Sequence, residues 1–348
     1  MILPFAIAVH ASAAEFMFRA DVNGQTLEGK PLTWTASEMM MLGRDGRLYD
    51  FDPREAKNGA KTGPKFIPYS MQELKRELYR EFGQTLDITT TQHYIVVHPR
   101  GSKDTWADRF EDLYRSCLQY FRVRGFTPRE PEFPLVAIVY RNQADYFAAA
   151  SASGTPMRPG TLGHYDLSSN RVFLFDTTDG KDTGDWTQNA DTIIHEATHQ
   201  TAYNVGIHTR FTEMPRWLVE GLATMFEARG VWNSASYTSL KDRINAGRLR
   251  DFKEYVAKRR QPGSIARLIT SDQAFRSDPL GAYAEAWALS FYLCETRPRE
   301  YVGYLEKTAA RPIFATYSDQ ERMADFQQSF GDWKQIESNF LTWMADVK

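Results

Sequence analysis

Apolar residues recur along the middle of this chain with two different spacings. Residues 92–97, 135–140 and 171–176 are short runs rich in β-branched and aromatic side chains, and each run predicts a β-strand. Residues 103–124 instead repeat with a helical period. The apolar face of this predicted helix holds Phe110, Leu113, Cys117, Leu118 and Phe121. Strands mixed with helices and followed by helices alone predict an α+β fold.

The N-terminal part follows a different pattern. Residues 16–49 alternate between apolar and polar positions and contain three turn signals, which predicts a small β-rich module. Residues 52–68 are rich in Gly, Pro, Lys and Asn and are expected to form a linker. We therefore expect the module and its linker over residues 15–68 and an α+β domain over residues 69–348, with a helical C-terminal subdomain from about residue 231.

The first residues have features of a secretory signal. Residues 2–9 are apolar and residues 11–13 are small, as in an apolar segment that precedes a cleavage site. They predict a signal peptide over residues 1–14 and therefore a secreted or periplasmic protein. Because the segment is short and lacks a basic start, a buried N-terminal strand is the alternative interpretation.

Composition limits the possible partners. The formal net charge is −2, and Lys and Arg are dispersed, so the basic surface typical of nucleic-acid binding is not expected. No other stretch is long and apolar enough to span a membrane. The two cysteines, Cys117 and Cys294, lie in apolar helical patterns and are expected to be buried free thiols. Nothing in the sequence indicates an oligomeric state.

The strongest chemical signal is the segment His195-Glu196-Ala197-Thr198-His199. Two histidines four residues apart lie on one face of a helix, where both can bind a single metal ion, and Glu196 then falls beside that ion as a candidate base. The flanking residues 192–194 and 200–203 carry no charge and no helix-breaking Gly or Pro, which favours a buried helix over a solvated one. The segment therefore predicts a metal site.

A catalytic zinc ion needs a third protein ligand and one open position. The metzincin pattern would place Gly and His where Ala202 and Val205 stand, so that class is excluded. A second predicted helix over residues 215–227, begun by Pro215, offers Glu220 among apolar neighbours. Because a buried carboxylate is costly unless it is paired or bound to a cation, Glu220 is the predicted third ligand.

Other roles for the neighbouring residues stay open. Glu220 could instead form an ion pair with Arg216 on the same helix. Glu213 and Glu227 are expected to be solvated carboxylates or carboxylates that support a ligand. His208 lies in a polar turn and is expected at the surface.

The combined pattern resembles the gluzincins, the thermolysin-like zinc peptidases whose third ligand is a glutamate followed by glycine. The residues that carry this resemblance are HExxH at 195–199 and Trp-Leu-x-Glu-Gly-x-Ala at 217–223. More narrowly, the chain is similar to the bacterial peptidase MA-like proteins, which are often secreted. The similarity covers the stretch from about residue 92 to the C-terminus.

This resemblance implies a zincin-like catalytic domain with a mixed sheet, an HExxH helix and a glutamate helix. It implies Zn²⁺ bound by His195, His199 and Glu220, and Glu196 as the general base that acts on a zinc-activated water. Related gluzincins supply a Tyr or His for the oxyanion from the helical C-terminal part. Residues 283–293 resemble that helix, which makes Tyr283 the candidate, although most of the 17 tyrosines are expected to pack or to lie at the surface.

The resemblance also bears on the substrate. It implies that the strand over residues 171–176 lies at the sheet edge, where an extended polypeptide substrate can pair with it. Aminopeptidases of this group carry a Gly-x-Met-Glu-Asn segment, and the nearest counterpart, residues 154–158, lacks the glutamate. The prediction is therefore a zinc-dependent peptidase, more specifically an endopeptidase. A non-catalytic zincin-fold binding or surface-assembly protein is the alternative, and a peptidoglycan-linked amide is an alternative substrate.

Overall fold

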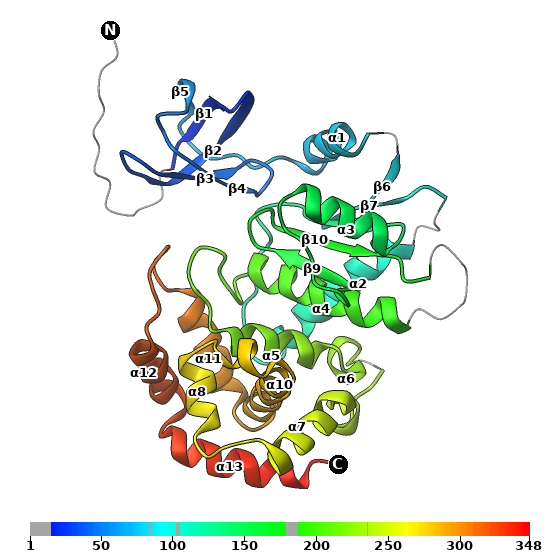
Figure 1. Ribbon diagram of the computed structural model, residues 1–348, viewed down its shortest axis with the longest axis vertical. Helices are drawn as coiled ribbons and strands as arrows, with labels where there is room; N and C mark the ends of the chain where they lie inside the picture. The colour runs from blue at the N-terminus through cyan, green and yellow to red at the C-terminus, as the bar shows by residue number, and fades with distance from the viewer. Residues whose placement is uncertain (1–14, 84, 102–104, 179–186, 235) are drawn as a thin grey trace.

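The computed structural model describes residues 15–83, 85–101, 105–178, 187–234 and 236–348 (Figure 1). The expected signal peptide, residues 1–14, lies outside this part of the chain. Two five-stranded sheets occupy the first half of the described chain, and helices alone follow the second sheet. In Figure 1 the first sheet lies at the top, the second in the middle, and the helices from α5 onward fill the lower part.

The first sheet is antiparallel throughout and has the order β4-β3-β2-β1-β5. Its strands are β1 (Met17–Val22), β2 (Gln25–Trp34), β3 (Met39–Gly43), β4 (Leu48–Phe51) and β5 (Lys57–Gly63). Strand β5 falls inside the segment expected as a linker, and it pairs with β1. The linker prediction was wrong for these residues. Strand β5 is almost wholly exposed, so its sequence lacks the apolar alternation that predicts a strand, and it joins the sheet through backbone pairing.

The second sheet is mixed and has the order β6-β7-β8-β10-β9. Its strands are β6 (Leu86–Thr90), β7 (Tyr94–Pro99), β8 (Leu135–Tyr140), β9 (Gly163–Asp166) and β10 (Arg171–Phe175). Strands β7, β8 and β10 are parallel, whereas β6 and β9 pair antiparallel at the two edges. The strand over residues 171–176, expected at the edge, is therefore interior, and β9 takes the edge position.

Helices cover both faces of the second sheet. The helices before the metal segment are α1 (Met71–Phe82), α2 (Thr105–Arg122) and α3 (Gln143–Ala152). Along β8, Val136 and Ile138 pack in a cluster with Leu74 of α1, whereas Ala137 and Val139 belong to the core shared with α2. Because neighbouring side chains of a strand point to opposite faces, a continuous apolar run fits a strand that is covered on both sides.

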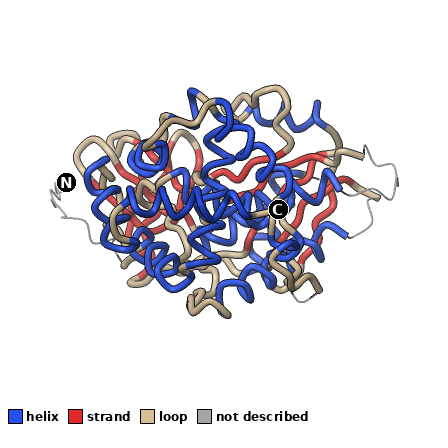
Figure 2. The backbone as a smooth tube through the Cα atoms, turned by 90° about the horizontal axis from the view of Figure 1, so that it is seen from below, coloured by secondary structure: helices blue, strands red, loops and turns tan. Residues whose placement is uncertain are grey.

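The remaining chain is helical. It comprises α4 (Thr187–Asn204), α5 (Arg216–Phe226), α6 (Arg229–Trp232), the 3₁₀ turn η1 (Lys241–Arg243), α7 (Ala246–Lys258), α8 (Ser264–Thr270), α9 (Ala274–Ser277), α10 (Pro279–Thr296), α11 (Pro298–Ala309), α12 (Asp319–Phe330) and α13 (Trp333–Asp346). Figure 2 shows the molecule from below relative to Figure 1, so the helical part faces the viewer and the strands lie mainly behind it. The mixed α and β content agrees with the expected fold class. None of the described helices is long and apolar enough to cross a membrane.

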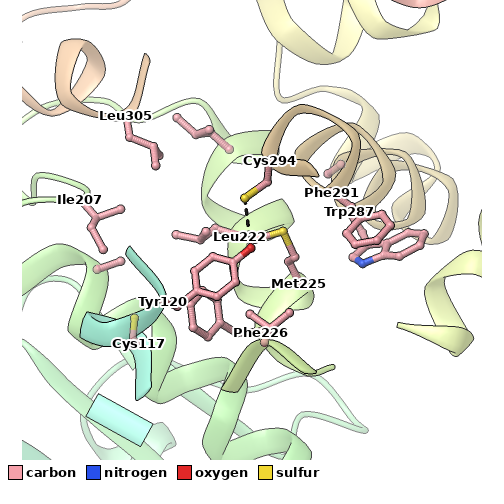
Figure 3. Packing of buried hydrophobic residues seen from close by; sticks show 14 of the residues in the cluster. Cys117, Tyr120, Ile207, Leu222, Met225, Phe226, Trp287, Phe291, Cys294 and Leu305 are labelled. Carbon is pink, nitrogen blue, oxygen red and sulfur yellow. Dashed lines mark hydrogen bonds between the residues drawn. The ribbon is translucent and has the colours of Figure 1, made fainter. Parts of the chain in front are cut away.

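Helix α5 packs against α10 in the apolar core shown in Figure 3. Tyr120 of α2 reaches this core, and its hydroxyl lies 3.1 Å from Cys294 Sγ. Both cysteines are buried free thiols, as expected. Gly221 allows the close approach of α5, because a Cβ atom there would lie 2.3 Å from Ser290 Oγ and 2.5 Å from the carbonyl oxygen of Ala286. The residue after Glu220 thus sets the distance between the two helices.

Gly221→Ala is therefore expected to destabilise the fold by about 2 kcal/mol, because the added methyl group meets backbone and α5 must shift away from α10. Equilibrium unfolding in urea measures this loss. Gly303→Ala is the matched control, since Gly303 is an exposed helical glycine with nothing within 4 Å of an added Cβ. That change is expected to be neutral or to stabilise by about 0.5–1 kcal/mol. Equal effects of the two substitutions would contradict the packing argument.

Candidate metal centre

Helix α4 brings His195 and His199 together on one face. Their Nε2 atoms are 3.1 Å apart, and the two rings meet nearly edge-on, with an interplanar angle of 83°. Ile193, Ile194 and Ala197 are buried in the core on other faces of the same helix. Since the apolar residues hold α4 against the core, the two imidazoles are presented as a pair, as the spacing predicted.

Glu220 of α5 faces this pair. Its Oε2 atom lies 3.5 Å from His195 Nε2 and 3.6 Å from His199 Nε2, and the three atoms all lie within 4.8 Å of one another. This Oε2 atom is buried and has no hydrogen-bond partner. A buried carboxylate oxygen opposite two imidazole nitrogens is a donor set that a divalent cation can satisfy. These three side chains fit a bound metal ion.

The electrostatics of the cluster favour positive charge between the three side chains. Burial opposes the charging of His195, but contacts with Glu220 and Glu227 outweigh burial and hold its pKa well above the ordinary value. Burial likewise opposes the ionisation of Glu220, but the two imidazoles outweigh it, so the pKa of Glu220 lies well below its usual range. The carboxylate is thus ionised at neutral pH, which is the form in which it can bind a cation.

The alternative pairing of Glu220 with Arg216 is also present. Arg216 Nε lies 3.4 Å from Oε1 of Glu220, one helical turn away. Because the arginine contacts Oε1 while Oε2 faces the histidines, the two interactions use different oxygen atoms. The ion pair therefore leaves the metal-facing oxygen of Glu220 available.

Glu227 supports His195 from behind. Its Oε1 atom lies 2.9 Å from His195 Nδ1, and its Oε2 atom accepts a hydrogen bond from Asn245 at 2.7 Å. When Nδ1 carries a proton toward Glu227, the lone pair of Nε2 is left free for a cation. A supporting role is one of the two roles expected for Glu227. The contact with Asn245 was not predicted, because this residue lies beyond α6 and reaches Glu227 only in the folded chain.

Glu196 points to the edge strand. Its Oε2 atom accepts a hydrogen bond of 2.7 Å from the backbone N–H of Tyr165 in β9. The strand approaches α4 closely because of Gly163, where a Cβ atom would lie 2.9 Å from Thr192 Cγ2. Strand β9 is not predictable from the sequence, since Gly163–Asp166 is short and lacks apolar alternation.

Tyr283 of α10 lies beside the third predicted ligand. Arg216 Nη2 is 3.3 Å from the Tyr283 hydroxyl. Burial raises the pKa of Tyr283 to about 12, and the negative charge of Glu220 adds to this shift. The hydroxyl therefore keeps its proton at neutral pH and remains a hydrogen-bond donor.

The prediction that His208 lies at the surface was wrong. Its side chain is buried and packs against Tyr203, with ring centroids 5.2 Å apart. The backbone N–H of His208 bonds to the carbonyl of Ala202, which draws the turn against the end of α4, and burial lowers the histidine pKa to about 3. Glu213, by contrast, is half-exposed and pairs with Arg322. Neither residue joins the metal cluster.

One family model matches part of the chain. Residues 189–315 match a family described as "Protein of unknown function (DUF1570)". No curated protein matches the chain. The fold is similar to the crystal structure of a mutant M1 zinc metallopeptidase from Deinococcus radiodurans, with 11% identity and a TM-score of 0.44. That similarity covers 97% of this chain and 62% of the peptidase, so the chain spans less than two thirds of its length.

Proposed function

We propose that this protein is a zinc-dependent peptidase of the gluzincin type, in which His195, His199 and Glu220 hold the ion. The observation that carries the proposal is the buried, unpartnered Oε2 atom of Glu220, which lies 3.5–3.6 Å from both imidazole Nε2 atoms. Two imidazoles and one carboxylate suit zinc and leave a position open for substrate. When bound, zinc supplies a Lewis acid that polarises a substrate carbonyl and makes water more acidic.

Glu196 is the proposed general base. It is not one of the three converging ligands, and the backbone N–H of Tyr165 fixes one of its oxygen atoms at 2.7 Å. The second oxygen is available to take a proton from the attacking water and to return it to the leaving amine. Tyr283 is proposed to donate its hydroxyl proton in a hydrogen bond to the developing oxyanion.

Strand β9 supports a polypeptide as the substrate. It is the edge of the second sheet, and the backbone N–H of Tyr165 points away from its partner strand toward Glu196. An extended peptide can add to such an edge through main-chain hydrogen bonds, which would place a peptide bond near the base. Because residues 154–158 lack the glutamate of the aminopeptidase segment, we propose an endopeptidase.

The test is hydrolysis of a mixed peptide library by the zinc-loaded protein, with new termini identified by mass spectrometry. Cleavage is expected to stop when a chelator removes zinc and to return when zinc is restored. A protein that binds one zinc ion per chain but cleaves no peptide would contradict the peptidase proposal and favour the binding-protein alternative.

Glu227→Ala is expected to weaken zinc affinity about 10–100-fold, because His195 loses the carboxylate that orients its ring. Competition with a chromogenic chelator measures this affinity. Glu213→Ala is the matched control, since this half-exposed carboxylate pairs with Arg322 and lies outside the cluster. An unchanged zinc affinity in Glu227→Ala would rule out the supporting role of this carboxylate.

A further inference from the structure

Two arginines flank Tyr283 beside the proposed zinc site. The guanidinium carbon of Arg216, from α5, lies 6.0 Å from the centre of the Tyr283 ring, and that of Arg248, from α7, lies 5.4 Å from it. Arg216 also lies over the ring of Phe275 at 4.9 Å. The aromatic rings therefore hold two positive charges next to the residue that is proposed to contact the oxyanion.

These arginines are less fully neutralised than Arg322 and Arg260, two buried arginines of the helical part. Arg322 is buried and pairs with two carboxylates, Glu213 and Asp272. Arg260 is likewise buried between Glu285 and Glu337. Both follow the general rule that a buried charge is paired.

Arg248, by contrast, has only a weak ion pair among the described residues. Its Nη1 atom lies 3.9 Å from Oδ2 of Asp251, at the limit of an ion pair. Arg216 contacts Glu220, whose charge is also required by the proposed zinc ion. The side chains of Arg216 and Arg248 are 42% and 25% exposed, so a ligand can reach both.

We propose that Arg216 and Arg248 recognise a carboxylate of the substrate, so that the protein acts on peptides that carry a negative charge close to the scissile bond. This inference rests on the proposed peptidase function. A guanidinium presents several N–H donors in a plane and binds carboxylates more strongly than neutral amides. The carboxylate can belong to an acidic side chain or to a free C-terminus, because both present the same group.

The experiment uses matched zinc-binding probes, so that it does not depend on turnover. The first pair is N-acetyl-glutamyl hydroxamate and N-acetyl-glutaminyl hydroxamate, which differ only in that the first has a side-chain carboxylate and the second a side-chain amide. Isothermal titration calorimetry measures the binding of each probe to the zinc-loaded protein. A second pair compares a peptidyl hydroxamate that has a free C-terminal carboxylate with its C-terminal amide. The acid is expected to bind about tenfold more tightly in at least one pair, and that pair identifies the source of the carboxylate.

Arg248→Ala is expected to abolish this preference while the amide probes bind as before, since Arg248 contacts none of the proposed zinc ligands. Arg250→Ala is the matched control, because Arg250 lies on the same helix, is 78% exposed and pairs with the same Asp251. Equal affinities within both probe pairs, or a preference that survives in Arg248→Ala, would overturn the inference. If no hydroxamate binds although zinc is present, the ion lacks an open position, and the peptidase proposal itself fails.

Discussion

Glu196→Gln is expected to lower kcat by about a thousandfold while the zinc content stays at one ion per chain. Glutamine has the shape of glutamate, and its side-chain oxygen can still accept the hydrogen bond from the Tyr165 N–H. It cannot take a proton from water, so the contribution of general base catalysis is lost. Single-turnover rates on a peptide that the wild type cleaves measure the effect, and elemental mass spectrometry measures the zinc.

Glu254→Gln is the matched control for this substitution. Glu254 is exposed on α7 and pairs only with Lys258 among the described residues. Its loss is expected to leave both kcat and zinc content unchanged. A Glu196→Gln variant that cleaves at the wild-type rate would show that another group acts as the base. A variant that loses zinc would show that Glu196 serves the ion directly.

The predictable part of the site is the part that is local in sequence. His195 and His199 are one helical turn apart, so their meeting follows from helix geometry alone, and the structure places their Nε2 atoms 3.1 Å apart. The prediction of Glu220 as the third ligand also depends on the next helix returning toward the first. Its apolar neighbours predicted a buried helix face, and Gly221 is where that face meets α10.

The features that were missed depend on contacts between distant segments. Strand β9 contains Gly163 and Asp166, which are poor strand formers, and it exists as a strand because β10 offers it a backbone partner. His208 sits in a polar stretch, yet a hydrogen bond to the end of α4 buries it. Asn245 reaches Glu227 only after the chain turns back from α6. Neither propensity nor spacing encodes such contacts.

Contacts between distant segments also position Glu196 and Glu220. Glu196 is held by the edge strand of the sheet, and Glu220 is held by the close packing of α5 on α10. One carboxylate is thus positioned by the mixed sheet and the other by the helical part. In Figure 1, α4 lies between the second sheet and the helices from α5 onward.

Glu220→Ala is expected to weaken zinc affinity by more than a hundredfold, a larger loss than that from Glu227→Ala, because it removes a direct ligand and not its support. Chelator competition gives the affinity, and elemental mass spectrometry gives the zinc retained after dialysis. His199→Ala is expected to behave in the same way, since its Nε2 atom and Glu220 Oε2 face the same point.

Arg216→Ala separates this role of Glu220 from a simple ion pair. If Glu220 only balances the charge of Arg216, removal of either partner should lower the stability of the fold. The Arg216→Ala and Glu220→Ala variants should then have the same zinc affinity. If Oε2 is a ligand, Arg216→Ala keeps one zinc ion per chain, because the arginine contacts the other oxygen, whereas Glu220→Ala loses it. A Glu220→Ala protein that binds zinc as tightly as the wild type would contradict the three-ligand site, and with it the assignment of α5 as the glutamate helix.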